Sequence, residues 1–218
     1  MKINWWKAAL AATTLTALYT MPGTLHAQRL GILAGGTFSQ LRGIDDVNAQ
    51  NRTGTMFGVS LLLPFGSSVA LQPELLFSNK GSRFNTGTGG EKNVRLDYLE
   101  VPLLLRYDLA GGAALDPHFY AGPSIGYNVG CSVKFSGTGI PNTSSDCSKS
   151  SFFDAKTLDW GAIVGAGVDL TVGGLGVTGG ARFGIGLADI NKTGSPTLTQ
   201  RVHNGTLTVY VGLLLGKR

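Results

Sequence analysis

A two-residue alternation of apolar and polar-or-small side chains runs through this sequence from Gln28 onward and leaves few folds open to it. Successive side chains of a β-strand point to opposite faces, so this pattern predicts strands with one apolar and one polar-or-small face. Eight segments of roughly ten residues carry it. The expected strands are residues 30–39, 56–64, 69–78, 98–108, 118–129, 159–170, 175–187 and 204–215.

The links between these segments alternate in length. Long polar links rich in Gly, Asn, Ser and Thr are expected near 41–53, 81–93, 134–156 and 190–201, and short ones near 64–68, 110–116 and 172–174. Long extracellular loops and short periplasmic turns in an even-stranded chain are typical of outer-membrane barrels. The sequence therefore predicts an all-β fold, an eight-stranded antiparallel up-and-down transmembrane β-barrel formed by residues 28–218.

The composition of the two faces separates this fold from a soluble, lipocalin-like barrel. A soluble barrel turns its apolar faces inward and carries charge outside. Here the polar-or-small face is rich in Gly, with few charges, and the apolar face has almost none. This favours an apolar face in contact with outer-membrane lipid and a small, polar lumen.

The first 27 residues have the three parts of a secretory signal peptide. Lys2 and Lys7 form the basic region, residues 8–19 the apolar region, and Ala27 ends the expected cleavage site. A membrane anchor is the alternative, but the segment is short and rich in threonine. Signal peptide and barrel together predict the bacterial outer membrane.

The charge balance argues against nucleic acid as a partner. Eighteen Lys and Arg stand against 13 Asp and Glu, and without Lys2 and Lys7 the excess is only +3. This charge is dispersed, whereas nucleic-acid-binding proteins concentrate it on one face. The sequence does not indicate an oligomeric state.

Cys131 and Cys147 are the two cysteines of the chain, and a polar segment separates them. In an exported protein this arrangement predicts a disulfide that closes an extracellular loop. Two free thiols are the alternative. A metal site is not expected, because no histidine or second cysteine pair lies nearby at ligand spacing.

Several charged residues fall on the polar-or-small face, so they are expected inside the barrel. We predict a structural network in the lumen in which Glu74 and Glu100 pair with Arg106 and Arg182. An unpaired charge in a narrow lumen is costly, which favours pairing. A proton or ion path is the functional alternative, but the side chains of eight strands just fill such a barrel.

Two motifs match catalytic or cofactor-binding sequences, but both are better explained as ordinary strand and turn residues. Gly122–Gly126, GPSIG, matches a nucleophile elbow around Ser124, with His118 or His203 as possible bases. An elbow needs a turn into a helix, and here the strand pattern continues. Gly174–Gly179, GLGVTG, matches a dinucleotide motif but no helix follows it. We therefore predict no catalytic residue, no cofactor, no metal and no enzyme activity.

Three prolines fall inside predicted strands, at Pro73, Pro102 and Pro123. A closed barrel has no free edge where a missing N–H would be harmless. We expect these prolines at bulges or where a neighbouring strand has ended.

Four segments of the chain occur together in a known order: LQPELLFSNKG, LDYLEVPLLLRYDL, FYAGPSIGYNVG and DWGAIVGAGVDL. They resemble the PorT-like family of outer-membrane β-barrel domain proteins, in which a Q-P-E-L strand precedes a Y-L/I-E-I/V-P strand. The resemblance covers Leu30 to Leu215 and implies an eight-stranded barrel in the outer membrane of a Gram-negative bacterium. It implies little about activity. The chain departs from the family in ending VGLLLGKR rather than in an aromatic residue.

The function expected from these features is a structural or surface-interaction role through the long extracellular loops, above all the Cys131–Cys147 loop, without an open channel. Envelope or extracellular proteins are the possible partners. The alternatives are an accessory component of an envelope secretion or transport assembly and, third, an enzyme that modifies outer-membrane lipid.

Overall fold

The computed structural model describes residues 28–42, 49–85, 90–109, 115–137, 140–147, 155–172, 175–190 and 202–216. The predicted signal peptide, residues 1–27, lies outside them. Among the described residues, no helix is long and apolar enough to cross a bilayer. The strands are β1 (Arg29–Arg42), β2 (Ala49–Pro64), β3 (Val69–Asn85), β4 (Gly90–Asp108), β5 (Leu115–Gly137), β6 (Ile140–Asp146), β7 (Leu158–Val172), β8 (Leu175–Gly186) and β9 (His203–Leu215).

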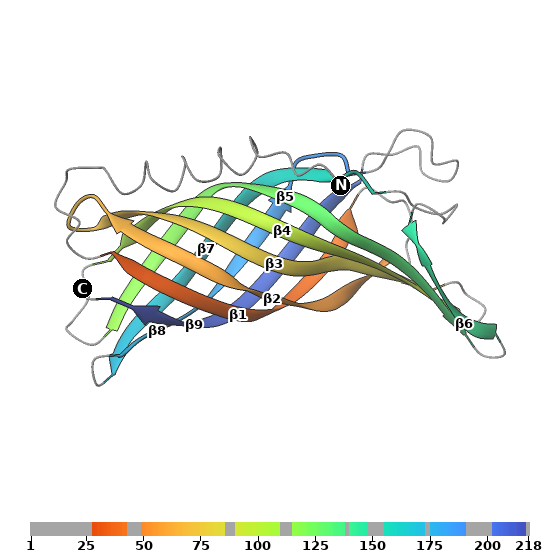
Figure 1. Cartoon of the computed structure of the whole chain (residues 1–218), viewed down its shortest axis with the longest axis horizontal. Helices are drawn as coiled ribbons and strands as arrows, with labels where there is room; N and C mark the ends of the chain where they lie inside the picture. Colours follow the sequence, from red (N-terminus) through yellow and green to blue (C-terminus); the bar gives the residue numbers. More distant parts are fainter. Residues whose placement is uncertain are drawn as a thin grey trace, which may run out of the picture.

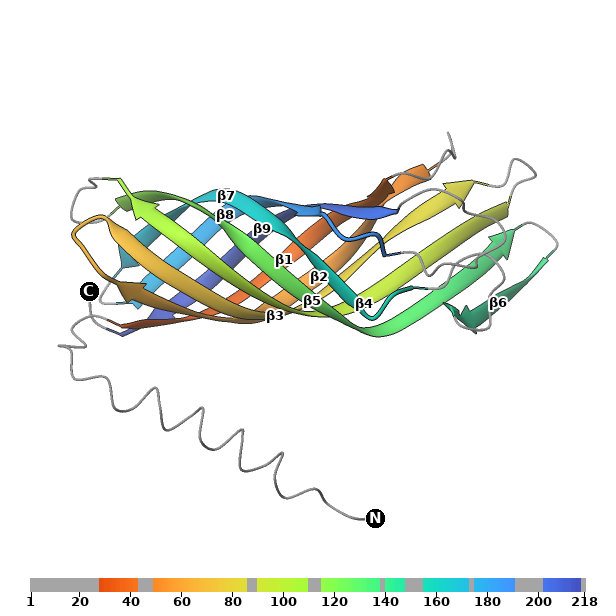
Figure 2. The ribbon, with the colours of Figure 1, turned by 90° about the horizontal axis from the view of Figure 1, so that it is seen from above.

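Eight of these strands close into a barrel (Figures 1 and 2). Each pairs antiparallel with its neighbours in the order β1, β2, β3, β4, β5, β7, β8 and β9, and β9 pairs with β1 to complete the ring. The remaining strand, β6, pairs with β5 outside the ring. The predicted eight-stranded antiparallel barrel is therefore confirmed, with β6 as an addition.

The predicted facing of the side chains is also confirmed. On β3, Gln72, Glu74 and Leu76 are buried in the lumen. Leu75, which lies between Glu74 and Leu76, is 46% exposed on the outer surface. The other barrel strands show the same alternation, and their exposed residues are large and apolar. The barrel thus carries an outer apolar belt, as contact with lipid requires.

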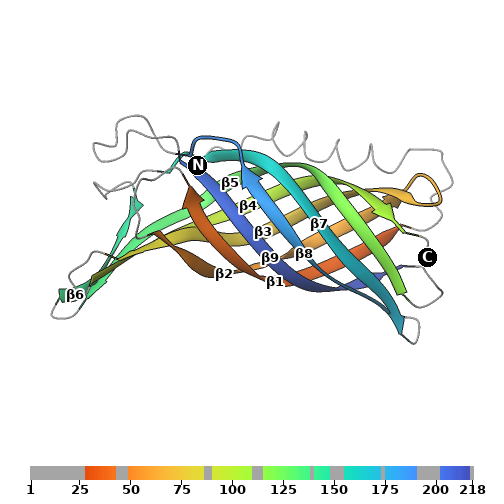
Figure 3. The same cartoon turned by 180° about the vertical axis from the view of Figure 1, so that it is seen from behind.

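The strands run further than the sequence pattern predicts. The described residues of the links expected near 81–93 and 134–156 are mostly strand, because β3, β4 and β5 continue past the belt and β6 joins them there (Figures 1 and 3). The outward face is polar here because it no longer meets lipid, while the inward face keeps buried apolar residues such as Val94 and Leu96. We call residues 79–85, 90–97 and 130–137 together with β6 the extension. It lies at the end opposite the short turns, which is the extracellular end.

A bulge in β5 separates the extension from the barrel. Asp97 pairs with Gly130 and Tyr98 pairs with Asn128, so Val129 has no partner on β4. One extra residue exchanges the two faces of a strand. Consequently the even residues of β5 face the lumen below the bulge, while Val133 above it is fully buried.

The in-strand prolines lie neither at bulges nor beside strand ends. Pro73 pairs with Leu103, Pro102 with Ser124, and Pro123 with Ala162. Each proline has no paired residue on the strand that precedes its own in the sequence. The register between those two strands is the same on both sides of the unpaired position, so no bulge is present there. The missing N–H therefore costs a pairing on one side, while the ladder on the other side holds the strand in place.

Candidate functional site

The lumen is filled by side chains in successive layers, and the first lies near the short turns. Arg106 Nη2 is 2.8 Å from Asp169 Oδ2 and 2.6 Å from Asp108 Oδ1. Arg29 Nη1 is 3.3 Å from Asp169 Oδ2, and His118 Nδ1 is 3.7 Å from the other carboxylate oxygen of Asp169, Oδ1. Asp169 on β7 thus joins residues from three other strands, and this charged layer ties the periplasmic end together.

The middle layer combines an ion pair with apolar and aromatic side chains. Arg182 Nη1 lies 2.5 Å from Glu74 Oε2, and Gln72 Nε2 donates to Glu74 Oε1 at 2.7 Å. The Arg182 guanidinium also lies 4.8 Å from the centroid of the Tyr210 ring, and Tyr120 Oη donates to Tyr210 Oη at 3.1 Å. Each barrel strand apart from β8 places one buried apolar or aromatic residue here: Leu33, Met56, Leu76, Leu104, Tyr120, Ile163 and Tyr210.

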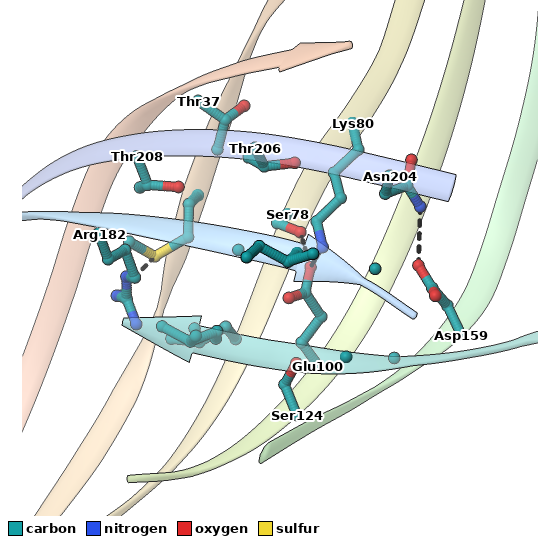
Figure 4. A pocket seen from close by; sticks show the side chains of 18 of the residues that line it. Thr37, Ser78, Lys80, Glu100, Ser124, Asp159, Arg182, Asn204, Thr206 and Thr208 are labelled. Atoms are coloured by element: carbon teal, nitrogen blue, oxygen red, sulfur yellow. Dashed lines mark hydrogen bonds and ion pairs between the residues drawn. The ribbon is translucent and has the colours of Figure 1, made fainter. Parts of the chain in front are cut away.

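A lumen cavity of about 40 Å³ is lined by Arg182 of the middle layer and by Ser78 and Lys80, which follow Glu74 on β3 (Figure 4). Lys80 Nζ is 2.9 Å from Glu100 Oε1, which also accepts a hydrogen bond from Ser78. Asn204 Nδ2 donates to Asp159 Oδ2 at 2.7 Å. Three glycines, Gly161, Gly184 and Gly186, leave parts of the wall on β7 and β8 without side chains.

Three buried residues that line the cavity keep an oxygen atom without a hydrogen-bond partner in the described part of the chain. These atoms are Asp159 Oδ1, Asn204 Oδ1 and Thr206 Oγ1. Buried polar atoms are normally satisfied, and a polar space of this size can hold water. Organic ligands occupy several hundred cubic ångströms, roughly tenfold more. The cavity therefore suits water rather than an organic ligand.

The predicted network of charges is formed in part. Glu74 pairs with Arg182 as expected, whereas Glu100 pairs with Lys80, and Arg106 pairs with Asp169 and Asp108. Sequence reasoning missed Lys80 because the strand was expected to end at residue 78. Continuing the alternation by one step from Ser78 would have placed Lys80 in the lumen.

The structure separates the residues of the possible nucleophile elbow. Ser124 lines the lumen cavity, and β5 continues unbroken through it, so no turn into a helix is present. His118 lies six residues away on the same extended strand, roughly 20 Å along it. His203 donates from Nδ1 to the Ala188 carbonyl at 2.9 Å. Residues 175–179 of the GLGVTG motif lie in β8, as expected of a strand, and Gly174 lies outside the described residues. No group of three or more His, Cys, Asp or Glu in the described ranges could hold a metal.

An apolar cluster closes the extracellular end of the lumen, and we call it the cap. Its buried members are Leu41, Phe84, Val94, Leu96, Tyr98, Val133, Cys147, Ile190 and Val202. They come from β1, β3, β4 and β5 and from segments next to β6, β8 and β9. Cys131 packs against the cap and forms the predicted disulfide with Cys147, with a Cα–Cα distance of 5.4 Å. The disulfide therefore fastens the segment after β6 to the cap.

Replacing Cys131 and Cys147 with serine is expected to loosen the cap and leave the barrel intact. A disulfide that closes a loop of this length contributes about 3 kcal/mol, which corresponds to roughly 100-fold faster amide exchange. Hydrogen exchange at Val133 and β6 measures the effect. Amides of the barrel, such as that of Val164, serve as the internal control. Unchanged exchange at β6 would contradict a role for the disulfide in holding the cap.

Comparison with known proteins places the chain among outer-membrane barrels. Residues 26–192 match the family described as outer membrane protein beta-barrel domain. No curated protein matches the chain. Among solved structures, Neisserial surface protein A is 14% identical with a TM-score of 0.47, covering 84% of this chain and 96% of that one.

Two further solved structures have lower TM-scores. The attachment invasion locus protein Ail of Yersinia pestis is 14% identical with a TM-score of 0.41, covering 86% of this chain and 98% of that one. The outer membrane enzyme PagL is 14% identical with a TM-score of 0.39, covering 87% and 99%. Structures at this distance carry no functional conclusion for this chain.

Proposed function

The chain belongs to the family of outer membrane protein beta-barrel domains, and we propose that it is a surface-interaction protein that makes contacts outside the cell through the extension. It lies in the bacterial outer membrane. Its partners are envelope or extracellular proteins in addition to outer-membrane lipid. Within the family, the QPEL and YLEVP segments support a place among the PorT-like barrels. Residues 1–27 serve as the export signal in this proposal.

One observation carries the proposal: the extension is an ordered sheet beyond the apolar belt. The outward row Phe57, Phe77 and Leu99 is apolar, and on β3 and β4 the next outward pair is Asn79 and Asp97. Above that row the sheet continues through β5 to β6 and is supported from inside by the cap. A pre-formed polar sheet loses little conformational entropy when it binds a partner.

The lumen supports the same proposal and argues against transport. Side chains of all eight strands meet in the layer of Arg182 and Tyr210, and the cap covers the extracellular end. An eight-stranded barrel has an interior just wide enough for such filling. The barrel therefore acts as an anchor for the extension, without an open channel.

A shortened hairpin tests this function. Phe135 and Thr143 are directly paired on β5 and β6, so residues 136–142 can be replaced by Asn-Gly, which favours a two-residue turn. Cys131 and Cys147 are unchanged. Cells with the shortened chain are expected to lose most of the attachment to protein-coated surfaces and to sister cells that the full chain confers.

The control variant carries Asn-Gly in place of Gly66-Ser67, in a short turn at the opposite end. It is expected to attach as the wild type does, and heat-modifiable gel mobility verifies that both barrels fold. If cells with and without the chain attach equally, the proposal is wrong. A change in secreted proteins or in lipid composition instead would favour the transport or enzyme alternatives.

A further inference from the structure

Three arginines gather on the outward face of β2, β3 and β4, just beyond the apolar belt. Arg83 and Arg95 lie in the extension, with side chains 40% and 43% exposed. Arg52 lies close enough to both for their charges to act on it. We call Arg52, Arg83 and Arg95 the arginine ledge.

The absence of a side chain at Gly81 on β3 leaves room for the side chain of Arg52. Arg52 Nε donates to Asn93 Oδ1 on β4 at 3.0 Å, and its Nη1 donates to the Lys80 carbonyl on β3 at 3.4 Å. A Cβ atom at Gly81 would lie 3.3 Å from Arg52 Cδ and 2.0 Å from the Val94 carbonyl oxygen. The bare backbone at Gly81 thus lets Arg52 cross β3 toward β4.

The carboxylates nearby neutralise the ledge only in part. Arg95 Nε is bound to Asp97 at 2.8 Å, whereas Arg83 Nε is 3.9 Å from Glu91 Oε1. Arg52 has no ion pair within the described part of the chain. Three guanidinium groups therefore face two carboxylates, and the net charge of the ledge is positive.

The height of the ledge determines what it meets. The belt ends at the aromatic pair of Phe57 and Phe77, whose ring centroids are 5.1 Å apart, and Leu99 continues this row on β4. Arg95 lies four residues above Leu99, which is roughly 10 Å in height for a tilted strand. The lipid headgroup layer is about this distance from the hydrocarbon.

We propose that the arginine ledge binds the phosphate groups of phosphorylated glycolipids in the outer leaflet. Arginine suits this role because its planar group can donate two parallel hydrogen bonds to a phosphate. The acyl chains of the same lipid would lie on the belt below, along Phe57 and Phe77. The ledge thereby fixes which lipid surrounds this side of the barrel.

The test compares lipids that share acyl chains and differ in phosphate. Full-length folded protein in detergent with EDTA is titrated with bisphosphorylated lipid A or its enzymatically dephosphorylated form, and native mass spectrometry counts bound lipid. The wild type is expected to bind the phosphorylated lipid at least tenfold more tightly. Equal binding would show that only the acyl chains are recognised and would overturn the proposal.

Variants of matched charge locate the site. R52Q, R83Q and R95Q together are expected to weaken binding on the order of 100-fold, at about fivefold per arginine. R42Q, K134Q and K156Q remove the same charge elsewhere at the extracellular end and should keep the lipid preference. Equal losses in both triple variants would reduce the effect to general charge and overturn the proposal.

Lysine variants separate the charge of the ledge from its paired hydrogen bonds, and a folding assay accompanies them. R52K, R83K and R95K together keep the charge of the ledge, and heat-modifiable gel mobility reports whether the barrel has formed. Because lysine cannot donate the paired hydrogen bonds, binding is expected between that of the wild type and that of the glutamine variant. Lysine variants that bind as weakly as the glutamine variant while folded would contradict the contribution of charge.

Discussion

Replacing Glu74 with glutamine is expected to lower the free energy of unfolding by about 3–5 kcal/mol, because the change leaves the Arg182 guanidinium charged and unpaired inside the barrel. The side chains of Arg182 and Glu74 are only 5% and 1% exposed, so water cannot replace the lost partner. The introduced amide would keep the shape of the carboxylate that it replaces. Urea unfolding in lipid vesicles measures the difference.

A second substitution distinguishes the lost charge from lost packing. When Arg182 is also replaced with methionine, no buried charge remains, and the E74Q/R182M variant is expected to recover most of the stability. If the double variant is as unstable as the sum of its single changes, the two residues are not coupled and the proposed network is wrong.

Glu91→Gln is the matched control. It makes the same chemical change in an ion pair with Arg83 whose N–O distance is 3.9 Å and whose side chains are 40% and 39% exposed. Exposed pairs of this kind contribute about 0–1 kcal/mol. A loss at Glu91 as large as that at Glu74 would show that burial does not decide the cost.

The pair of Glu74 and Arg182 shows which features of the lumen can be predicted from sequence. The alternation places Glu74 inside and Leu75 outside because the two faces meet different surroundings, and a slip of one residue would exchange them. The structure confirms this placement. Facing is therefore a local property that the order of residues reveals.

Which side chains pair across the lumen depends on the stagger between neighbouring strands around the barrel. The alternation of residues along one strand does not predict that stagger. Glu100 therefore pairs with Lys80 rather than with an arginine. For the same reason the apolar layer was not foreseen: Leu33 and Ile163 interrupt the small residues of their faces, but only the closed barrel brings them together.

The extension was missed for a different reason. Its residues, such as Asn79 and Arg95, resemble those of loops, and the pattern that identifies a membrane strand depends on lipid at one face. Beyond the belt this requirement ends, while backbone pairing continues from Asn79 with Asp97 to Asn85 with Glu91. A sequence pattern that depends on lipid cannot detect a strand in water.

Replacing Val164 with arginine is expected to lower the free energy of unfolding by about 2–4 kcal/mol, because the charge would lie near the middle of the hydrocarbon layer. Val164 is 53% exposed on the outward face of β7, midway between Leu158 and Leu170. Its neighbours in register, Ala121 and Phe183, offer no carboxylate. The same urea titration in vesicles measures the loss.

Leu158→Arg is the control on the same face of the same strand. Leu158 is 55% exposed, almost as much as Val164, but it begins β7 at the extracellular edge of the belt. There the cost of arginine is expected to fall to about 0–1 kcal/mol, since the side chain reaches the headgroups. On a barrel surrounded by water both substitutions would be nearly neutral. Equal effects at the two positions would therefore contradict an apolar belt in contact with lipid, because only depth in a bilayer distinguishes two residues so similarly exposed.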